Sequence, residues 1–217
     1  MKYKVVKIDM NSKRYPEKLK NIGSSPKQLF CLGNLELLNR KSIAVIGSRN
    51  YSKYGERAAK EFSYNLAKND ICIVSGFARG IDSFSHIACL EVNGKTIAVL
   101  GSGLNVIYPK ENKELFSKII SNDGLIISEY PLDTKPEKQH FPARNRIISG
   151  LSDGVLVIEA RKNSGTNITV DFALEQGKDV FVIPGNIYSK TSDGTNFLIK
   201  EGAIPVTSYK DILDFLN

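Results

Sequence analysis

The sequence predicts an α/β protein with a parallel sheet covered by helices on both faces. From Ser42 onward, short apolar runs alternate with longer segments whose apolar residues recur at helical spacing. The short runs are almost continuously apolar, which is typical of strands buried on both faces of a parallel sheet. The 217 residues are enough for one such domain with a sizeable core.

The first 41 residues lack this regularity. They are rich in lysine and are interrupted by Tyr15-Pro16 and Ser25-Pro26, while residues 29–32 fit a short strand and Gly33-Asn34 a turn. We expect residues 1–41 to form an N-terminal extension packed on the core, and residues 42–217 to form the domain that carries the binding site.

The elements of this second part follow one another in order. The expected strands cover residues 43–46, 71–74, 96–100, 125–127, 155–158 and 180–183. The expected helices cover residues 55–69, 81–92, 111–121, 143–150, 167–176, 195–200 and 210–216, with a long loop at 128–139.

Glycine, serine and arginine gather where these strands end. In an open α/β sheet, ligands bind beyond the carboxyl ends of the strands. Helix N-termini and Gly/Ser/Thr loops offer free backbone N–H groups to anions. We expect five loops to converge on one rim, at residues 47–49, 75–82, 101–103, 140–146 and 163–166.

The rim loop before the fifth strand carries an aromatic ring next to a proline. Pro142 fits the first turn of a helix, where its missing N–H group needs no partner. The residue before a proline is biased towards extended backbone. We therefore expect the Phe141 ring to project from the loop ahead of a helix that begins at Ala143.

Two arginines follow in the same segment. Arg144 and Arg146 stand two residues apart, so they cannot both point the same way from a helix. We expect one to contact phosphate and the other to pair with a carboxylate such as Glu159 or Asp153. The sequence leaves open which of the two arginines has which role.

The charge distribution favours an anionic ligand. The formal net charge is +7, and residues 1–70 contain 15 Lys and Arg against 6 Asp and Glu, whereas the remainder contains 15 against 17. Nucleic acid is the leading candidate for such a partner. The alternative is a lysine-rich solvated surface without a ligand.

Several classes of protein are excluded by motifs that the sequence lacks. It has neither G-x-G-x-x-G after a strand nor a P-loop, so no dinucleotide or other cofactor is expected. His86 and His140, its two histidines, lie in no cluster at metal-ligand spacing, so no metal is expected. Cys31, Cys72 and Cys89 lack CxxC spacing and indicate reduced core residues of a cytoplasmic protein. No apolar run approaches the roughly 18 residues of a membrane span.

A set of short motifs then occurs in one unbroken order. They are AVIGSR at 44–49, SGFARGID at 75–82, FPARNRIISGLS at 141–152, EA at 159–160, SGT at 164–166, VIPG at 182–185, GTN at 194–196, LI at 198–199 and GA at 202–203. Taken together they resemble the DNA-processing protein A family (DprA, also called Smf), over about residues 14–217.

The resemblance implies an extended Rossmann-like fold with helices on both faces. It implies a homodimer that binds single-stranded DNA, protects incoming strands and helps to load the RecA recombinase in natural transformation. Many members carry a small helical domain in front and a winged-helix-like domain behind. Because this chain begins almost at the core and ends at Asn217, we expect a core-only member or a chain cut to the core.

The leading hypothesis is a non-catalytic single-strand binding module, in which basic loops neutralise phosphates and Phe141 stacks on a base. The expected DNA contacts are Gly47, Ser48, Arg49, Gly76, Ala78, Arg79, Lys138, Gln139, Phe141, Arg144, Asn145, Arg146, Ser164, Gly165 and Thr166. Arg49 is expected to be a principal phosphate contact, beside the backbone N–H groups of Gly47 and Ser48. The resemblance places self-association at the carboxyl-terminal helix and the strand after Gly202, with Asn196, Phe197, Ile199 and Lys200 at the interface.

Two alternatives use the same rim. One is an enzyme, because broader relatives of this fold include nucleotide phosphoribohydrolases with P-G-G-x-G-T-x-x-E. The position of that glutamate is Thr169 here, which cannot act as a carboxylate base, so we expect no enzyme. The other is a small-nucleotide sensor that binds mononucleotides tightly and gains little with oligomer length.

Overall fold

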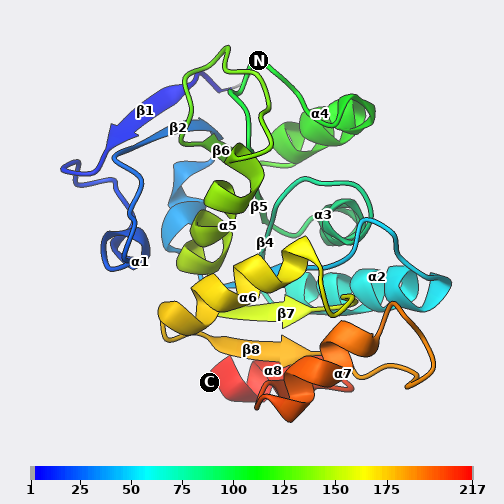
Figure 1. Cartoon of the computed structure of the whole chain (residues 1–217). Coiled ribbons are helices and arrows are strands. Elements are labelled where there is room, and N and C mark those ends of the chain that lie inside the picture. The colour runs from blue at the N-terminus through cyan, green and yellow to red at the C-terminus, as the bar shows by residue number, and fades with distance from the viewer. Residues whose placement is uncertain (1–2, 217) are drawn as a thin grey trace.

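The computed structural model describes residues 3–216 and is organised around a nine-stranded sheet in the order β1-β2-β6-β5-β4-β3-β7-β8-β9 (Figure 1). The strands are β1 (Val6–Asp9), β2 (Gln28–Gly33), β3 (Ser42–Ile46), β4 (Cys72–Ser75), β5 (Thr96–Val99), β6 (Leu125–Ser128), β7 (Gly154–Val157), β8 (Asp179–Val182) and β9 (Ile204–Pro205).

The helices lie between the strands along the chain. They are α1 (Glu17–Lys20), α2 (Lys53–Lys68), α3 (Ile81–Glu91), α4 (Lys113–Ser121), α5 (His140–Leu151), α6 (Gly165–Glu175), α7 (Asp193–Lys200) and α8 (Tyr209–Leu216), with short 3-10 turns at Leu35–Asn39 and Lys110–Asn112. The expected strands and helices are all present, with ends that differ by a few residues.

The sheet is mixed, and its larger part is parallel. Strands β3 to β9 run parallel to one another, whereas β2 pairs antiparallel with β6 on one side and with the edge strand β1 on the other. The predicted α/β fold with a Rossmann-like parallel sheet is therefore confirmed, with an antiparallel edge built from the first part of the chain. β1 escaped prediction because it is four residues long and buries fully only Ile8.

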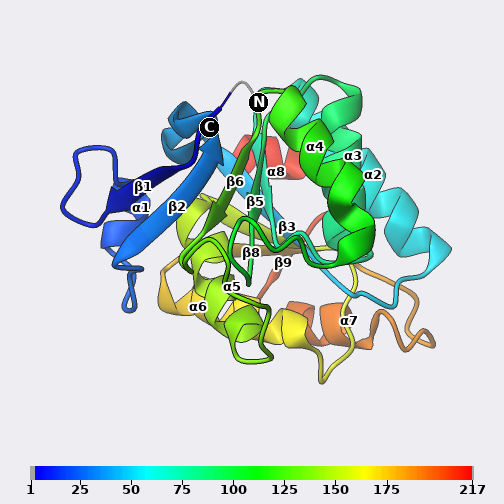
Figure 2. The same ribbon diagram turned by 90° about the horizontal axis from the view of Figure 1, so that it is seen from above.

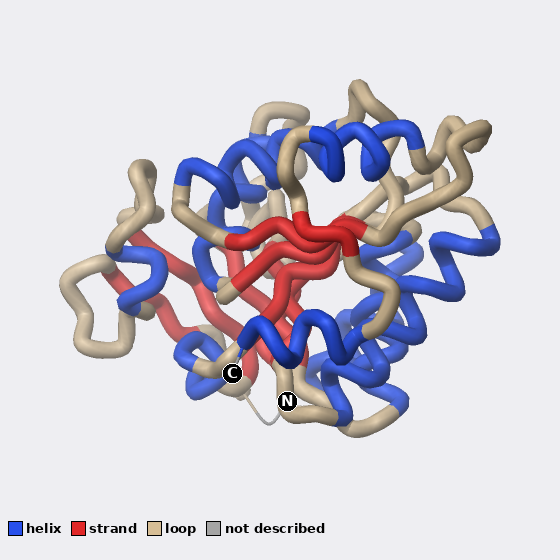
Figure 3. The backbone as a smooth tube through the Cα atoms, turned by 90° about the horizontal axis from the view of Figure 1, so that it is seen from below, coloured by secondary structure: helices blue, strands red, loops and turns tan. Residues whose placement is uncertain are grey.

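The helices form a layer on each face of the sheet (Figures 2 and 3). Helices α1, α5, α6 and α7 cover one face, and α2, α3, α4 and α8 cover the other. In β3, Ala44 and Ile46 pack into the core on the first face, while Ile43 and Val45 pack into the core on the second. Burial on both faces explains why these strands are apolar at nearly every position.

The order of the strands reverses between β3 and β7. From β3 the chain builds outward through β4, β5 and β6, and it then returns to place β7 on the other side of β3. The helix after β3, α2, covers one face, and the helix after β7, α6, covers the other. The two connecting loops therefore diverge at the carboxyl ends of β3 and β7, and such a reversal is where open α/β sheets bind ligands.

Helix α3 carries a buried histidine, His86, on its core-facing side. His86 Nδ1 lies 2.7 Å from Thr96 Oγ1, which itself donates to the carbonyl of Ile73, so the histidine is the donor of this hydrogen bond. Burial lowers the pKa of His86 to about 3. Cys31, Cys72 and Cys89 are also buried and free, as expected of core residues, and burial raises the pKa of the first two to about 12.

His86 should make the native state sensitive to acid. The unfolded chain takes up this proton near pH 6.5, whereas the native state does so only near pH 3, so stability falls as the pH falls through this window. The slope attributable to His86 is about 1.4 kcal/mol per pH unit. Urea unfolding at a series of pH values between about 7 and 5 should give a flatter dependence for His86→Asn, which keeps a donor for Thr96 but does not titrate. Parallel curves for the two proteins would contradict this.

Candidate nucleic-acid interface

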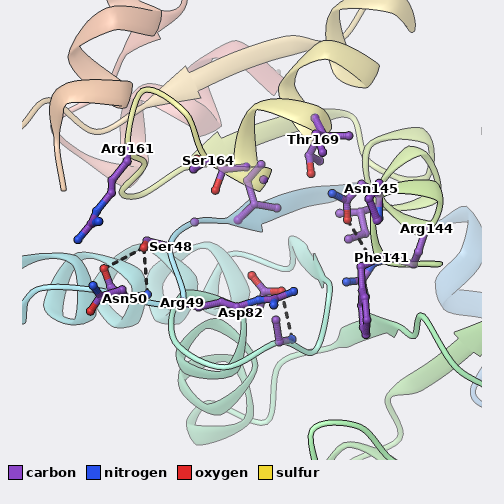
Figure 4. A pocket seen from close by; sticks show the side chains of 18 of the residues that line it. Ser48, Arg49, Asn50, Asp82, Phe141, Arg144, Asn145, Arg161, Ser164 and Thr169 are labelled. Atoms are coloured by element: carbon purple, nitrogen blue, oxygen red, sulfur yellow. Dashed lines mark hydrogen bonds between the residues drawn. The ribbon is translucent and has the colours of Figure 1, made fainter. Parts of the chain in front are cut away.

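An open cleft of about 620 Å³ lies at the carboxyl ends of β3 and β7 (Figure 4). It is lined by the loop after β3, the start of α3, the start of α5 and the start of α6. A second hollow of about 240 Å³ shares several of its lining residues and reaches Gly76 and Gly101. The structure thus brings together residues from all five loops that were expected to converge.

Most of the expected contact residues line these two hollows. The larger is lined by Gly47, Ser48, Arg49, Ala78, Lys138, Phe141, Arg144, Asn145, Ser164, Gly165 and Thr166, and the smaller adds Gly76 and Arg79. Gln139 and Arg146 line neither. The Gln139 amide instead donates to the Glu137 carboxylate at 2.8 Å.

Arg146 points away from the cleft and is bound to a carboxylate that the sequence did not indicate. Its two terminal nitrogens contact the two Glu129 oxygens at 2.8 and 2.6 Å, and its Nε donates to the carbonyl of Ser24. This bidentate pair raises the pKa of Arg146. The prediction that Glu159 or Asp153 would pair with the arginine was wrong, since both carboxylates accept hydrogen bonds from other groups.

Arg144 is buried and holds the ends of two strands. Its Nη1 donates to the carbonyl oxygens of Gly76 and Val99, which follow or end β4 and β5. Burial lowers the pKa of Arg144 to about 10, so the guanidinium stays charged at neutral pH. The side chain reaches the cleft only from its floor, and its first role is to tie together the carboxyl ends of two neighbouring strands.

A buried carboxylate accompanies Arg144. Asp82 accepts a hydrogen bond from the N–H of Ala78 at 3.2 Å, and burial raises the pKa of its carboxyl while Arg144 opposes that rise. A Cβ atom on Gly76 would lie 2.7 Å from Asp82 Oδ2 and 2.8 Å from Arg144 Nη2. A side chain at this position would therefore force Asp82 or Arg144 to move, because those contacts are shorter than a real Cβ atom tolerates.

Phe141 lies on the cleft wall, but its backbone differs from the expectation. Helix α5 begins at His140, so Phe141 is helical, and Pro142 takes the third helical position, where the N–H group would also have lacked a partner. The ring is half-buried. Its centroid is 5.6 Å from that of Tyr108, and the Arg49 guanidinium carbon lies 5.7 Å from it. The sequence did not predict Tyr108 as a cleft residue, because nothing around it distinguishes it from other tyrosines in loops.

The exposed cations of the cleft differ in how free they are. Arg49 is exposed and, within residues 3–216, forms no ion pair, whereas Arg79 pairs with Glu111. Lys138 and Arg161 also line the cleft and are exposed, and neither has a carboxylate partner in the described part of the chain. Arg161 was not expected, although its place directly after β7, on the rim, was the available signal.

The loop that carries Arg49 is fixed at both ends by Glu159. The N–H of Ser48 donates to the Glu159 carbonyl at 2.9 Å. Contrary to the expectation, this N–H group is therefore not available to an anion. The buried Glu159 carboxylate accepts from the Ser52 N–H at 2.9 Å, the Ser52 hydroxyl at 2.6 Å and the Thr191 hydroxyl at 2.8 Å. It lies at the N-terminus of α2, where a negative charge is stabilised.

The N-terminus of α6 forms the opposite wall of the cleft. Figure 4 shows Arg161, Ser164 and Thr169 on one side, facing Ser48 and Arg49 on the other. The Ser164 hydroxyl is buried and has no partner among the described residues. A helix N-terminus flanked by unpaired cations suits an anion.

Two other kinds of site find no support in the residues that the structure describes. Within residues 3–216, no group of three His, Cys, Asp or Glu side chains is placed to hold a metal ion. None of the helices in that range combines the length and the apolar character that crossing a bilayer requires.

Comparison with known proteins places these features in a family. Residues 7–217 match the model of the DNA recombination-mediator protein A family. The chain is 47% identical to Protein Smf of Escherichia coli, covering 97% of this chain and 56% of that protein, and 51% identical to DNA processing protein DprA of Streptococcus pneumoniae, covering 92% and 70%. It thus spans little more than half the length of the first of these relatives.

Solved structures of similar proteins support the same family assignment. The DNA processing protein A of S. pneumoniae superposes with a TM-score of 0.92 at 48% identity, over 97% of this chain and 74% of that one. The protein from Helicobacter pylori, which binds single-stranded DNA, gives 0.86 at 32% identity, over 100% and 96%. A molybdenum cofactor binding protein from Rippkaea orientalis shares the fold alone, with a TM-score of 0.56 at 17% identity.

Arg144 should matter for stability more than any exposed cleft arginine. Arg144→Met keeps the length of the side chain but removes the charged donor shared by two buried carbonyl groups, so we expect a loss of about 2–4 kcal/mol in the free energy of unfolding. Urea denaturation measures this, with Arg161→Met as the matched control at an exposed position. Equal stability of the two variants would show that Arg144 is not structural.

Proposed function

Because the chain belongs to the DNA recombination-mediator protein A family, we propose that it binds single-stranded DNA in the cleft between α5 and α6. The observation that carries the proposal is the combination of exposed cations without carboxylate partners and aromatic rings on one wall of an open cleft. Single-strand binding without sequence preference needs both features, since cations hold the backbone and rings stack on bases.

The two walls support a division of roles. Arg49, Lys138, Arg161 and the N-terminus of α6 are suited to phosphate groups, because each presents positive charge or free N–H groups to the cleft. Phe141 is suited to a base. Only Asp82 among the cleft-lining residues is acidic, and it lies buried beside Arg144, so the field in the cleft favours anions.

We propose a binding protein and not an enzyme. Glycosidic cleavage uses a pair of carboxylates across the scissile bond. Thr169, at the position of the glutamate in related nucleotide phosphoribohydrolases, lines the cleft and is buried. Asp82 has no second carboxylate opposite it among the cleft-lining residues, and Glu159 is occupied by Ser52 and Thr191.

The biological role follows from the family. We propose that the protein acts in the cytoplasm on DNA taken up during natural transformation, protecting the single strand and helping to load the RecA recombinase. The names of the relatives, which are DNA processing proteins, support a role in DNA processing.

We further propose that the protein is a homodimer through α7 and β9. Ile199 packs against the core, whereas Phe197 lies outside the core clusters, beneath the Lys162 ammonium at 4.7 Å from its ring. Asn196 is committed within the protein by two hydrogen bonds to Gly185, which leaves Phe197 and the exposed Lys200 for a partner. β9 is a sheet edge of two residues beside this helix.

The DNA proposal is tested by fluorescence anisotropy with labelled single-stranded and duplex oligonucleotides over a salt series. Phe141→Ala should weaken single-strand binding by about 1–3 kcal/mol and leave duplex binding almost unchanged, because stacked bases offer no free face. Arg49→Ala should weaken binding to all sequences and lower the salt slope by about one.

Arg57→Ala is the matched control, since Arg57 is an exposed arginine on α2 whose Nε lies 3.9 Å from Glu61. Equal losses on both substrates, or a large fall in melting temperature, would mean that Phe141 acts as a core residue. Full affinity with an unchanged slope would remove Arg49 from the contacts.

The dimer proposal predicts that Phe197→Glu yields a folded monomer. A charge at this position should be tolerated by the isolated chain but not inside an apolar contact between two copies. Sedimentation equilibrium gives the mass, and circular dichroism checks the fold. A monomer already in the unmodified protein at tens of micromolar would refute the proposal.

A further inference from the structure

The loop between β8 and α7 presents two large apolar side chains to solvent. Ile187 is 77% exposed and Tyr188 is 90% exposed, more than any other large apolar residue described. They are consecutive residues in the middle of the loop at 183–192, and we call them the tip of this loop. Exposing two large apolar side chains to water is unfavourable in free energy, and a partner that covers them would remove this cost.

The tip is exposed although its backbone is well held. The N–H of Tyr188 donates to Asn186 Oδ1 at 2.9 Å, and the N–H of Ser189 donates to the Asn186 carbonyl at 3.0 Å. The base of the loop is held to α2 by the Tyr54 hydroxyl, which donates to the Pro184 carbonyl at 2.7 Å. The turn therefore holds the Tyr188 backbone in place before any partner arrives, which lowers the entropy lost on binding.

The same loop is bound to the cleft. The Thr191 hydroxyl donates to the Glu159 carboxylate, which also holds Ser52 at the end of the Arg49 segment. In Figure 1 this loop lies beside the N-terminus of α2, and Figure 2 agrees. The tip thus stands in a fixed relation to the cleft wall that carries Arg161.

Positive charge continues from the cleft to the tip. Lys53 and Lys190 are exposed and, with Arg161, have no carboxylate partner within residues 3–216. A protruding aromatic ring bordered by free cations has the composition of a track for single-stranded nucleic acid. The homodimer proposed above uses α7 and β9, and a further copy seated on the tip alone is disfavoured, because two side chains cover far less than the roughly 1,200 Å² that stable protein interfaces bury.

We propose that the Ile187–Tyr188 tip is a second base-stacking contact, so that one DNA strand runs from Phe141 past Arg161 to Tyr188. This inference rests on the proposed single-strand binding and extends it. The contact requires a strand long enough to leave the cleft. The effect of removing this contact should therefore depend on oligonucleotide length, whereas the effect of removing a contact inside the cleft should not.

The test compares oligo(dT) of about 4 and about 16 nucleotides, the range of single-strand site sizes, by anisotropy. Tyr188→Ala should weaken binding of the longer strand roughly five- to a hundredfold and leave the shorter strand unchanged. Tyr188→Phe should retain full affinity because the ring remains. Tyr64→Ala is the matched control, since Tyr64 is an exposed tyrosine about 16 Å along α2 from its rim end.

The outcomes separate the two proposals. If the unmodified protein binds single strands and Tyr188→Ala matches it at both lengths, the tip contact is refuted and the cleft proposal stands. A change in sedimentation without a change in DNA affinity would refute it in favour of a second copy. If the unmodified protein binds neither length, both proposals fail.

Discussion

Burial of the central strands on both faces is the constraint on which this structure depends. In strands β3 to β7 the serine and threonine side chains stand only at end positions, so polar chemistry gathers where the strands begin and end. The reversal of strand order between β3 and β7 then opens one crevice at those ends. The place of the cleft therefore follows from apolar packing, before any residue in the cleft is considered.

Within the cleft, buried and exposed charges have different tasks. Arg144 and Glu159 are buried, and each binds the end of a secondary-structure element: carbonyls of strand ends in one case, and the start of α2 in the other. Arg49, Lys138 and Arg161 remain in solvent without carboxylates nearby. The buried charges fix the loops, and this leaves the exposed cations available for a ligand.

The strands, the helices and the rim could be predicted because they depend on periodicity and on the residues that end strands. The orientation of individual side chains could not. Arg146 pairs with Glu129, which lies in the loop after β6, and no local sequence spacing links those two positions. Phe141 is helical because α5 starts three residues early, and the bias that proline imposes was too weak to prevent it. Tyr108 and Arg161 reach the cleft only through tertiary packing.

The antiparallel edge of the sheet has a consequence for synthesis of the chain. β2 is made early, yet its partner β6 follows only after about ninety further residues, and Phe30 pairs with Ser128. Until the ribosome has released β6, Leu29 and Cys31 have no sheet to cover them, and a two-stranded hairpin alone is only marginally stable. The nascent protein must therefore keep its first strands unsatisfied while β3, β4 and β5 assemble. A chain stopped before residue 128 would expose an open, apolar sheet edge of the kind that invites aggregation or chaperone binding.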